Sequence, residues 1–240
     1  TGNYFTHTPS ADAEYGFSNA GAVQTFQLEV TGAVNGYELS GAAYDSVSFS
    51  VSGQDTSPLD LTFNNDGTKM YIVGNANDRL YQYSLSTAYD LSTASYDSIS
   101  FSVSSQDTGP SDMIFNSDGT KMYVVGFIND NIYQYSLTTA YALNTASYDS
   151  VSLSLAAQDS FPAGVAFNNN GTKMYIVGGG NDAVYQYSLS TAFDLSTTSY
   201  DSVSFSVSGQ DSSAPDLTFN NDGTKMYVLG WGGQDVNEYD

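Results

Sequence analysis

The chain of 240 residues contains no cysteine and very few cations: five Lys and Arg stand against 26 Asp and Glu, for a formal net charge of −21. The lack of cysteine excludes disulfides, thiol catalysis and cysteine-based metal sites. The lack of cations argues against nucleic acid and anionic membranes as partners, because clustered Lys and Arg recognise both. No apolar run approaches the roughly 20 residues of a membrane-spanning helix, so we expect no membrane insertion.

Histidine is scarce as well. The single His, His7, lies among Thr, Pro and Ser with no other ligand type at metal-site spacing, so we interpret it as a solvated loop residue. What the chain has in abundance is Ser, Thr, Asn and Tyr in β-type patterns. This composition favours an exported protein, and we predict an extracellular, cell-surface or virion-surface location.

A nine-residue segment organises most of the sequence. FNNDGTKMY begins at Phe63 and returns, with small changes, at Phe115, Phe167 and Phe219, always 52 residues apart. A fixed period of this size is typical of repeat architectures. The Asn-Asp-Gly centre of the segment accepts the positive φ angles of a tight hairpin turn. An oxygen-rich loop of this kind could also hold Ca²⁺, but it lacks the spaced acids of a calcium loop, and we favour the turn.

Four strand-like segments recur in each unit. They are exemplified by residues 59–63, 69–74, 79–85 and, in strict alternation of Ser with apolar residues, 44–52. No stretch has a helical apolar period. The pattern predicts an all-β fold, a β-propeller of four-stranded antiparallel blades with a 52-residue repeat; a right-handed β-helix is the alternative. The order of the segments predicts four blades, with the strand at 44–52 pairing with the last strand to close the ring. The alternative is a fragment of a larger ring or a ring shared between subunits.

Residues 1–43 lie outside the repeat and are predicted to be an N-terminal extension, whereas residues 44–240 form the propeller. One segment of the extension, residues 23–30, alternates as a strand does. A single strand is not stable alone, so we expect it to dock onto a neighbouring subunit by β-augmentation. Its apolar residues are the assembly candidates: Val23, Phe26, Leu28 and Val30.

The strand, the DG-K-x-Y turn and the strand after it resemble the bacterial YVTN-type and lactonase-like β-propeller repeats. The longer, Ser/Thr-rich unit also resembles repeats of secreted and phage-borne surface proteins. Such families include enzymes, surface-layer proteins and adhesins, so the resemblance implies a fold more than a function. The resemblance also implies that the enzymatic relatives have acidic or His metal ligands along the central channel. In this sequence we identify no set of such residues that departs from the four-fold repeat.

Sequence variation between the repeats concentrates in two loops that a propeller places on one face. The first reads TSPLD, TGPSD, SFPAG and SSAPD, and the second reads NANDR, FINDN, GGNDA and WGGQD. Three aromatic residues there are candidates for binding glycans or a protein partner: Phe127, Phe161 and Trp231. The alternative is that they only plug the channel mouth or pack between blades.

Acidic residues recur in the same region. The second loop carries four candidates for a symmetric cation site, Asp78, Asp130, Asp182 and Asp235. A local turn formed by Asn-Asp is the interpretation that we favour, so no metal site or cofactor is assigned, with Ca²⁺ as the alternative. A second set is expected to cap the entry to the first strand of each blade: Asp55, Asp107, Asp159 and Asp211.

Catalysis needs an acid and a base in unlike environments, whereas the repeated Asp residues occur in near-equivalent copies. The sequence therefore predicts no enzyme, but a non-enzymatic extracellular propeller that serves as a structural or adhesive subunit of a cell surface, filament or virion. Its expected partners are further copies of itself or a neighbouring surface protein. A glycan-binding, lectin-like module is the alternative, and a lactonase-like enzyme ranks third.

Overall fold

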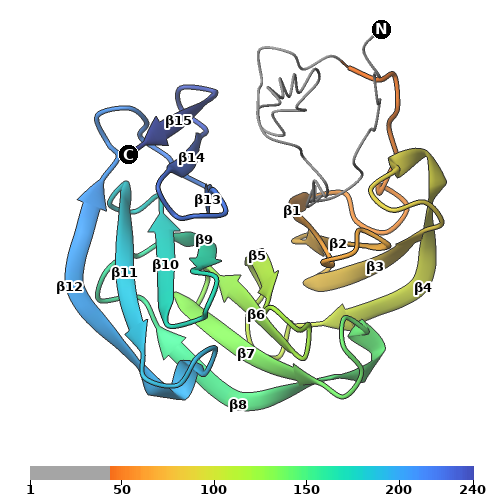
Figure 1. Ribbon diagram of the computed structural model, residues 1–240, viewed down its shortest axis with the longest axis horizontal. Coiled ribbons are helices and arrows are strands. Elements are labelled where there is room, and N and C mark those ends of the chain that lie inside the picture. Colours follow the sequence, from red (N-terminus) through yellow and green to blue (C-terminus); the bar gives the residue numbers. More distant parts are fainter. Residues whose placement is uncertain (1–43) are drawn as a thin grey trace, which may run out of the picture. The chain divides into compact units, whose positions relative to one another are not determined.

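The computed structural model describes residues 44–240, an all-β region built from four antiparallel sheets in chain order (Figure 1). The first sheet contains β1 (Pro58–Phe63), β2 (Lys69–Gly74), β3 (Arg79–Leu85) and β4 (Ala94–Ser102). The second contains β5 (Pro110–Phe115), β6 (Lys121–Gly126), β7 (Asn131–Leu137) and β8 (Ala146–Ser154). The third contains β9 (Pro162–Phe167), β10 (Lys173–Gly178), β11 (Ala183–Leu189) and β12 (Thr198–Ser206). The fourth contains β13 (Asp216–Phe219), β14 (Met226–Gly230) and β15 (Asp235–Tyr239).

These sheets confirm the predicted four-bladed propeller of antiparallel strands. A 3-10 helix of three residues precedes the outer strand of each of the first three blades, at Leu91–Thr93, Leu143–Thr145 and Leu195–Thr197. In the described part of the chain no helix is long and apolar enough to span a bilayer.

The hairpin between the first two strands of each blade is held by its own side chains. In the first blade the Lys69 amide donates to Asn64 Oδ1 at 2.9 Å, and the Thr68 amide and hydroxyl both donate to Asp66 Oδ1 at 2.9 and 2.6 Å. Gly67 supplies the left-handed conformation with φ of 70°. The turn interpretation is therefore correct, because the loop oxygens are occupied by the chain itself.

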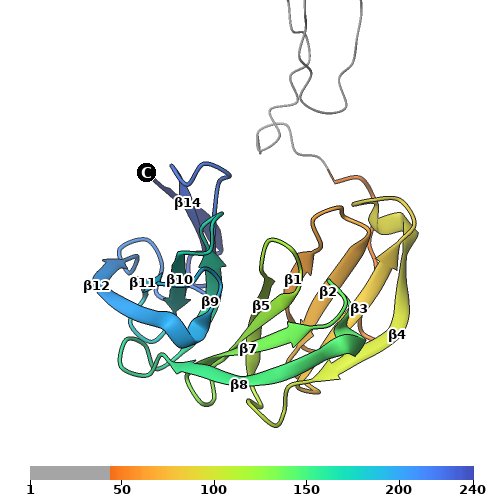
Figure 2. The same ribbon diagram turned by 60° about the horizontal axis from the view of Figure 1, so that its bottom comes forward.

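Consecutive blades pack through their inner strands, and the same hydrogen bonds recur at both junctions between the first three blades. The inner strands β1, β5, β9 and β13 lie next to one another in order (Figure 1, Figure 2). The buried Tyr71 of the first blade donates its hydroxyl to the carbonyl oxygen of Tyr141 in the second blade at 2.5 Å. The Leu143 amide donates to Gln82 Oε1 at 2.9 Å across the same junction. The partners of these hydrogen bonds occupy the same repeat positions at both junctions. The sequence of one repeat therefore determines how the next repeat packs against it.

The predicted closure of the ring is not seen in residues 44–240. The segment at 44–52 is not a strand, and β15 pairs only with β14 among the described residues. Phe49 instead packs edge-on against Tyr83 of the first blade, with ring centroids 5.6 Å apart, as Phe101 of β4 packs against Tyr135 of the second blade at 5.4 Å. Packing between blades, rather than strand pairing, holds this segment. The predictions for His7 and for the assembly candidates Val23, Phe26, Leu28 and Val30 lie outside the described residues.

Candidate functional site

Three inner strands carry an Asp at the same repeat position near the start of the strand. These residues are Asp60 of β1, Asp112 of β5 and Asp216 of β13. The carboxyl groups of Asp60 and Asp112 share a hydrogen bond, and the charges of Asp60 and Asp216 act on each other. The fold thus gathers three carboxylates from blades that are far apart in sequence. We call Asp60, Asp112 and Asp216 the axial carboxylates.

Backbone amides hold the axial carboxylates in place. The Met113 amide donates to Asp60 Oδ2 at 3.1 Å, and the Val165 amide donates to Asp112 Oδ2 at 2.6 Å, each from the following blade. Among residues 44–240, Asp216 accepts from the amide of its own neighbour Leu217, at 2.7 Å, and from no amide of another blade. The Asp216 carboxylate is therefore not tied to a neighbouring blade, whereas the other two are.

Burial raises the pKa of all three axial carboxylates. Desolvation is the main cause, and the pKa of Asp112 is raised well above its usual value, helped by the charges of Asp60 and Asp216. Desolvation together with the charge of Asp60 raises the pKa of Asp216 to about 7. Like charges held close together in a desolvated site oppose the ionisation of all three groups. With a pKa near neutral pH, Asp216 can accept and release a proton.

The third blade breaks the pattern, because β9 has Gly164 where the other inner strands have Asp. A Cβ atom at Gly164 would lie 2.8 Å from Cα and 3.0 Å from Oδ1 of Asp216. A side chain at position 164 would collide with the neighbouring Asp216, which is why glycine is needed there. This asymmetry separates the environment of Asp216 from those of its repeat equivalents.

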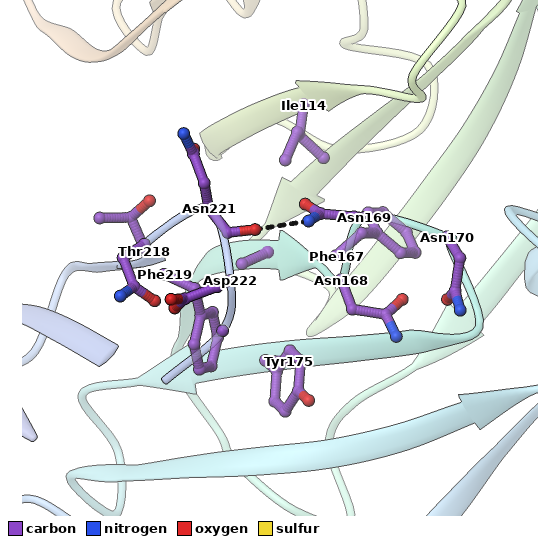
Figure 3. Close-up of a pocket in the computed structure, with 13 residues that line it drawn as sticks. Ile114, Phe167, Asn168, Asn169, Asn170, Tyr175, Thr218, Phe219, Asn221 and Asp222 are labelled. Carbon is purple, nitrogen blue, oxygen red and sulfur yellow. Dashed lines mark hydrogen bonds between the residues drawn. The ribbon is translucent and has the colours of Figure 1, made fainter. Parts of the chain in front are cut away.

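A cavity of about 370 Å³ lies between the third and fourth blades, with Tyr175, Asn169 and Asn221 among its lining residues (Figure 3). Asn169 Nδ2 donates to the carbonyl oxygen of Asn221 at 2.6 Å across it. Its wall includes Ile114 and Thr218, each two residues beyond an axial carboxylate on the same strand. Residues i and i+2 of a strand share a face, so the carboxylates and this cavity lie along one side of the inner strands.

The cavity is suited to a small polyhydroxylated molecule. Its lining combines the amide groups of Asn168 and Asn221 with the aromatic rings of Phe219 and Tyr175 (Figure 3). Polar groups that fix orientation in a partly apolar cleft are the usual make-up of a small-molecule site.

The axial carboxylates do not fit the metal ligands that the resemblance implies. Within residues 44–240, no three His, Cys, Asp or Glu side chains are grouped as a metal site requires. Several of the axial oxygens are also occupied by backbone amides of neighbouring strands. No step of the proposed reaction therefore runs through Ca²⁺ or another metal.

The aromatic loop candidates do not line the cavity between the third and fourth blades. Phe127 and Phe161 stack on each other between the second and third blades, with ring centroids 4.8 Å apart. Trp231 is 70% exposed and lines a separate hollow with Pro215 and Val236. The structure therefore places the two Phe residues together and Trp231 elsewhere. Their role in binding a partner stays a prediction.

The acidic loop candidates do not converge on one point. Asp78, Asp130 and Asp182 each adopt a left-handed conformation, with φ of 51°, 50° and 49°. Their backbone oxygens accept hydrogen bonds from the residues that follow the outer strands, at 2.7 to 3.0 Å, as expected of a turn. Burial raises the pKa of each, but the charges acting on them come from Asp55, Asp107, Asp159 and Asp211 rather than from one another. Asp235 is not a repeat equivalent, since Gln234 has that conformation in the fourth blade.

The second acidic set has the capping role that we predicted, and its carboxylates also accept hydrogen bonds from the second variable loop. Asp107 Oδ1 accepts from the Gly109 amide at 2.9 Å, and Oδ2 accepts from the Asn129 amide at 3.0 Å and the Tyr133 hydroxyl at 3.3 Å. The carboxylate thus ties both variable loops of its blade together. It lies against Gly126, where any side chain would collide with it.

Sequence reasoning missed the axial carboxylates. They end three of the four variable loops (TSPLD, TGPSD and SSAPD), and the third copy ends in Gly. That difference was the signal for a broken four-fold pattern. The sequence alone does not reveal the site, because the distance between carboxyl groups on different blades, and therefore their desolvation, depends on how the blades pack.

Solved structures with the same fold are distant in sequence. A putative 6-phosphogluconolactonase from Bacteroides uniformis is 10% identical with a TM-score of 0.56, over 76% of this chain and 50% of that one. Its counterpart from Bacteroides fragilis is 13% identical with a TM-score of 0.55, over 76% and 50%. A functionally unknown protein from Desulfotomaculum acetoxidans is 13% identical with a TM-score of 0.55, over 77% and 55%. The chain thus spans about half the length of these structures, and no curated protein matches it significantly.

A family model for lactonases of the seven-bladed β-propeller type matches residues 11–236. The match confirms the lactonase-like part of the resemblance. It overturns the prediction of a non-enzymatic structural or adhesive subunit and the prediction that the chain is no enzyme. Those predictions rested on the apparent equivalence of the repeated acids, which Gly164 breaks. The chain belongs to the lactonase family of seven-bladed β-propellers.

Proposed function

We propose that this chain hydrolyses a lactone, with Asp216 as the general base. One observation carries the proposal: in a chain of the lactonase family, Asp112 and Asp216 lie two residues before Ile114 and Thr218, which line a cavity, and the pKa of Asp216 is about 7. A general base acts best when its pKa lies near the working pH. The Asp60–Asp112 pair, whose pKa values are both raised by burial, supplies the matching acid.

The reaction balances with these groups alone. Asp216 takes a proton from water, and the water oxygen attacks the lactone carbonyl carbon. The bond between that carbon and the ring oxygen then breaks, and the Asp60–Asp112 pair donates its proton to the ring oxygen. The products are a carboxylic acid and a hydroxyl group, and the proton on Asp216 returns to the pair.

The charge distribution favours an unphosphorylated substrate. All four Lys side chains are paired with acids on strands β4, β8, β12 and β15 or with the C-terminal Asp240, and Arg79 donates to Ser100 Oγ at 2.8 Å. A phosphate group near the axial carboxylates would therefore meet like charge and no free cation. We accordingly assign the substrate class as neutral sugar lactones, whose hydroxyl groups suit the Asn-lined cavity.

The experiment measures acid release from D-glucono-1,5-lactone and from its 6-phosphate at pH 7, above the spontaneous rate. We expect hydrolysis of the first, little of the second, and a loss of at least about 100-fold in kcat with Asp216→Asn, as is typical when a general base is removed.

Asp66→Asn is the matched control. It removes one carboxylate from the exposed hairpin turn of the first blade, which does not line the cavity, at a position where the third repeat already has Asn170, so the rate should not change. Equal rates for Asp216→Asn and the unmodified chain would contradict the assignment of the base. No hydrolysis of any lactone by the unmodified chain would contradict the proposed function itself.

A further inference from the structure

One hairpin turn differs from the other three in the side chain before its glycine. That residue is Asp66, Asp118 and Asp222 in the first, second and fourth blades, and Asn170 in the third. Asn170 Oδ1 accepts from the Thr172 amide at 3.1 Å and from the Thr172 hydroxyl at 2.6 Å. The aspartates accept from the threonine at the same place in their own hairpins. The third hairpin therefore makes the same turn with an uncharged acceptor.

The turn favours a carboxylate at this position. Hydrogen bonds from the threonine hydroxyl and amide lower the pKa of Asp66, Asp118 and Asp222 below the usual value. A hydrogen bond to a charged acceptor is also stronger than one to a neutral acceptor. A change of Asn170 to Asp would therefore strengthen both hydrogen bonds from Thr172 without any other rearrangement of the hairpin.

The residue after Asn170 makes that change chemically accessible. Asn170 is the only Asn of residues 44–240 that is followed by Gly. Because glycine has no Cβ, its backbone nitrogen can reach the side-chain carbonyl carbon of the preceding Asn. A bond forms between these two atoms, the bond from that carbon to the amide nitrogen breaks, and ammonia leaves with the proton of the backbone nitrogen. Water then opens the resulting five-membered succinimide to give either Asp or isoaspartate.

The hydrogen bonds of the hairpin prepare both the carbonyl group and the leaving group. The two donors of Thr172 draw electron density from the Asn170 side-chain carbonyl, and donors on a carbonyl oxygen favour attack at its carbon. Within residues 44–240, Asn170 Nδ2 donates to no other group, so nothing retains the ammonia that leaves. Asn169 is different, because its Nδ2 donates to the Asn221 carbonyl oxygen at 2.6 Å and the residue after it is not glycine.

The closed hairpin holds the attacking nitrogen in place. The Gly171 amide donates to the Asn168 carbonyl oxygen at 2.9 Å, and the Phe193 ring lies against Gly171, where a side chain would collide with it. The reaction therefore proceeds in molecules whose hairpin has opened locally, and exposed turns open at low free energy. Asn170 is exposed, and so are its equivalents in the first two blades, where the next blade is present.

We propose that Asn170 is a modification site, which water converts to Asp through a succinimide formed with Gly171. The product gives the third hairpin the sequence of the first and the fourth. Isoaspartate lengthens the main chain by one carbon atom and does not reproduce the turn, so it returns to the succinimide, whereas Asp is retained by the closed hairpin. The conversion needs no enzyme and does not depend on lactone hydrolysis.

The test incubates the full folded chain at several pH values and follows residue 170 by peptide mapping and mass spectrometry. We expect the mass of its peptide to rise by the difference between an amide NH2 and a hydroxyl group, with Asp as the main product. Because the deprotonated backbone nitrogen attacks, the rate should rise about tenfold for each pH unit. In water labelled with heavy oxygen, the product should carry one labelled atom. The other Asn-Gly pair, Asn35-Gly36, gives a separate peptide.

Asp66→Asn is the matched variant, because it places Asn-Gly at the same position of the first hairpin. We expect a second site of conversion there, at a rate comparable to that of Asn170. Asn170→Asp should abolish the mass change at residue 170 and should unfold at the same or a higher urea concentration than the unmodified chain. An unchanged residue 170, conversion of Asn169 at the same rate, isoaspartate as the main product or a lower unfolding midpoint of Asn170→Asp would each overturn the proposal.

Discussion

Two sets of aspartates recur along this chain, and they differ in their hydrogen bonding and in their pKa values. Asp55, Asp107, Asp159 and Asp211 occur in all four copies, are buried and accept several hydrogen bonds each from the loops of their own blade. The axial carboxylates occur in three copies, meet one another across blades and have raised pKa values. Strict repetition thus marks acids that hold the blade, whereas broken repetition marks acids available for chemistry.

The difference has a simple physical origin. An oxygen that accepts two or three backbone amides is stabilised in its charged form and is committed to the structure. A carboxyl group that is desolvated beside other carboxyl groups is destabilised when charged and binds protons more readily. The four predictions that follow test this contrast from the largest expected effect to the smallest.

Removing an acid of the repeated set should cost stability and not activity. Asp107→Ala leaves the Gly109 and Asn129 amides and the Tyr133 hydroxyl without their acceptor. Unsatisfied buried donors are costly, so we expect a loss of about 3 kcal/mol in the free energy of unfolding. Urea unfolding measures this loss. A change below about 1 kcal/mol, or a loss of activity per folded molecule, would show that the two sets are not distinct.

Restoring the four-fold pattern should damage the site. Gly164→Asp places a side chain where a Cβ atom would already lie 2.8 Å from Cα of Asp216, and it adds a fourth carboxyl group. We expect a loss of about 2 kcal/mol from overpacking. Gly164→Ala has the same backbone clash without the charge, so lactone hydrolysis by the two variants separates packing from electrostatics. Equal activity in Gly164→Asp and the unmodified chain would contradict the importance of the asymmetry.

The fold could be predicted from the sequence in detail because the strand and turn patterns lie within each repeat. The segments at 69–74 and 79–85 were predicted with the bounds that the structure has, and the Asn-Asp-Gly hairpin is the turn expected. These features depend on neighbours in sequence. The pairing of residues 44–52, the separation of Asp78 from Asp130 and the meeting of Asp60 with Asp216 depend on the angle between blades, and a local pattern does not encode that angle.

The pH dependence of stability gives a third test. Because the pKa of Asp216 is about 7 in the folded chain, above its unfolded value of about 3.8, the stability linked to this group is fully present below pH 3.8 and is lost as the pH rises through 7. We expect Asp216→Asn to remove a decline of about 2 kcal/mol between pH 4 and pH 7.5, after allowing for partial exposure. Unfolding curves at several pH values measure it, and parallel pH profiles for the two proteins would refute the raised pKa.

The smallest effect is expected at the aromatic loop residues. Trp231 is 70% exposed and does not line the cavity between the third and fourth blades, so Trp231→Ala should change the free energy of unfolding by less than about 0.5 kcal/mol. Lactone hydrolysis by this variant should equal that of the unmodified chain. A marked loss of hydrolysis, with the fold intact by circular dichroism, would move the site from the axial carboxylates to the loop face.

The most direct test of the axial site is the pH profile of kcat/KM for D-glucono-1,5-lactone, corrected for spontaneous hydrolysis. Activity that depends on ionised Asp216 should rise with pH and level off above an inflection near 7, where the pKa of this residue lies. The rise should vanish in Asp216→Asn and persist in the control Asp66→Asn. An inflection near pH 4, or the same inflection near 7 in Asp216→Asn, would contradict the account.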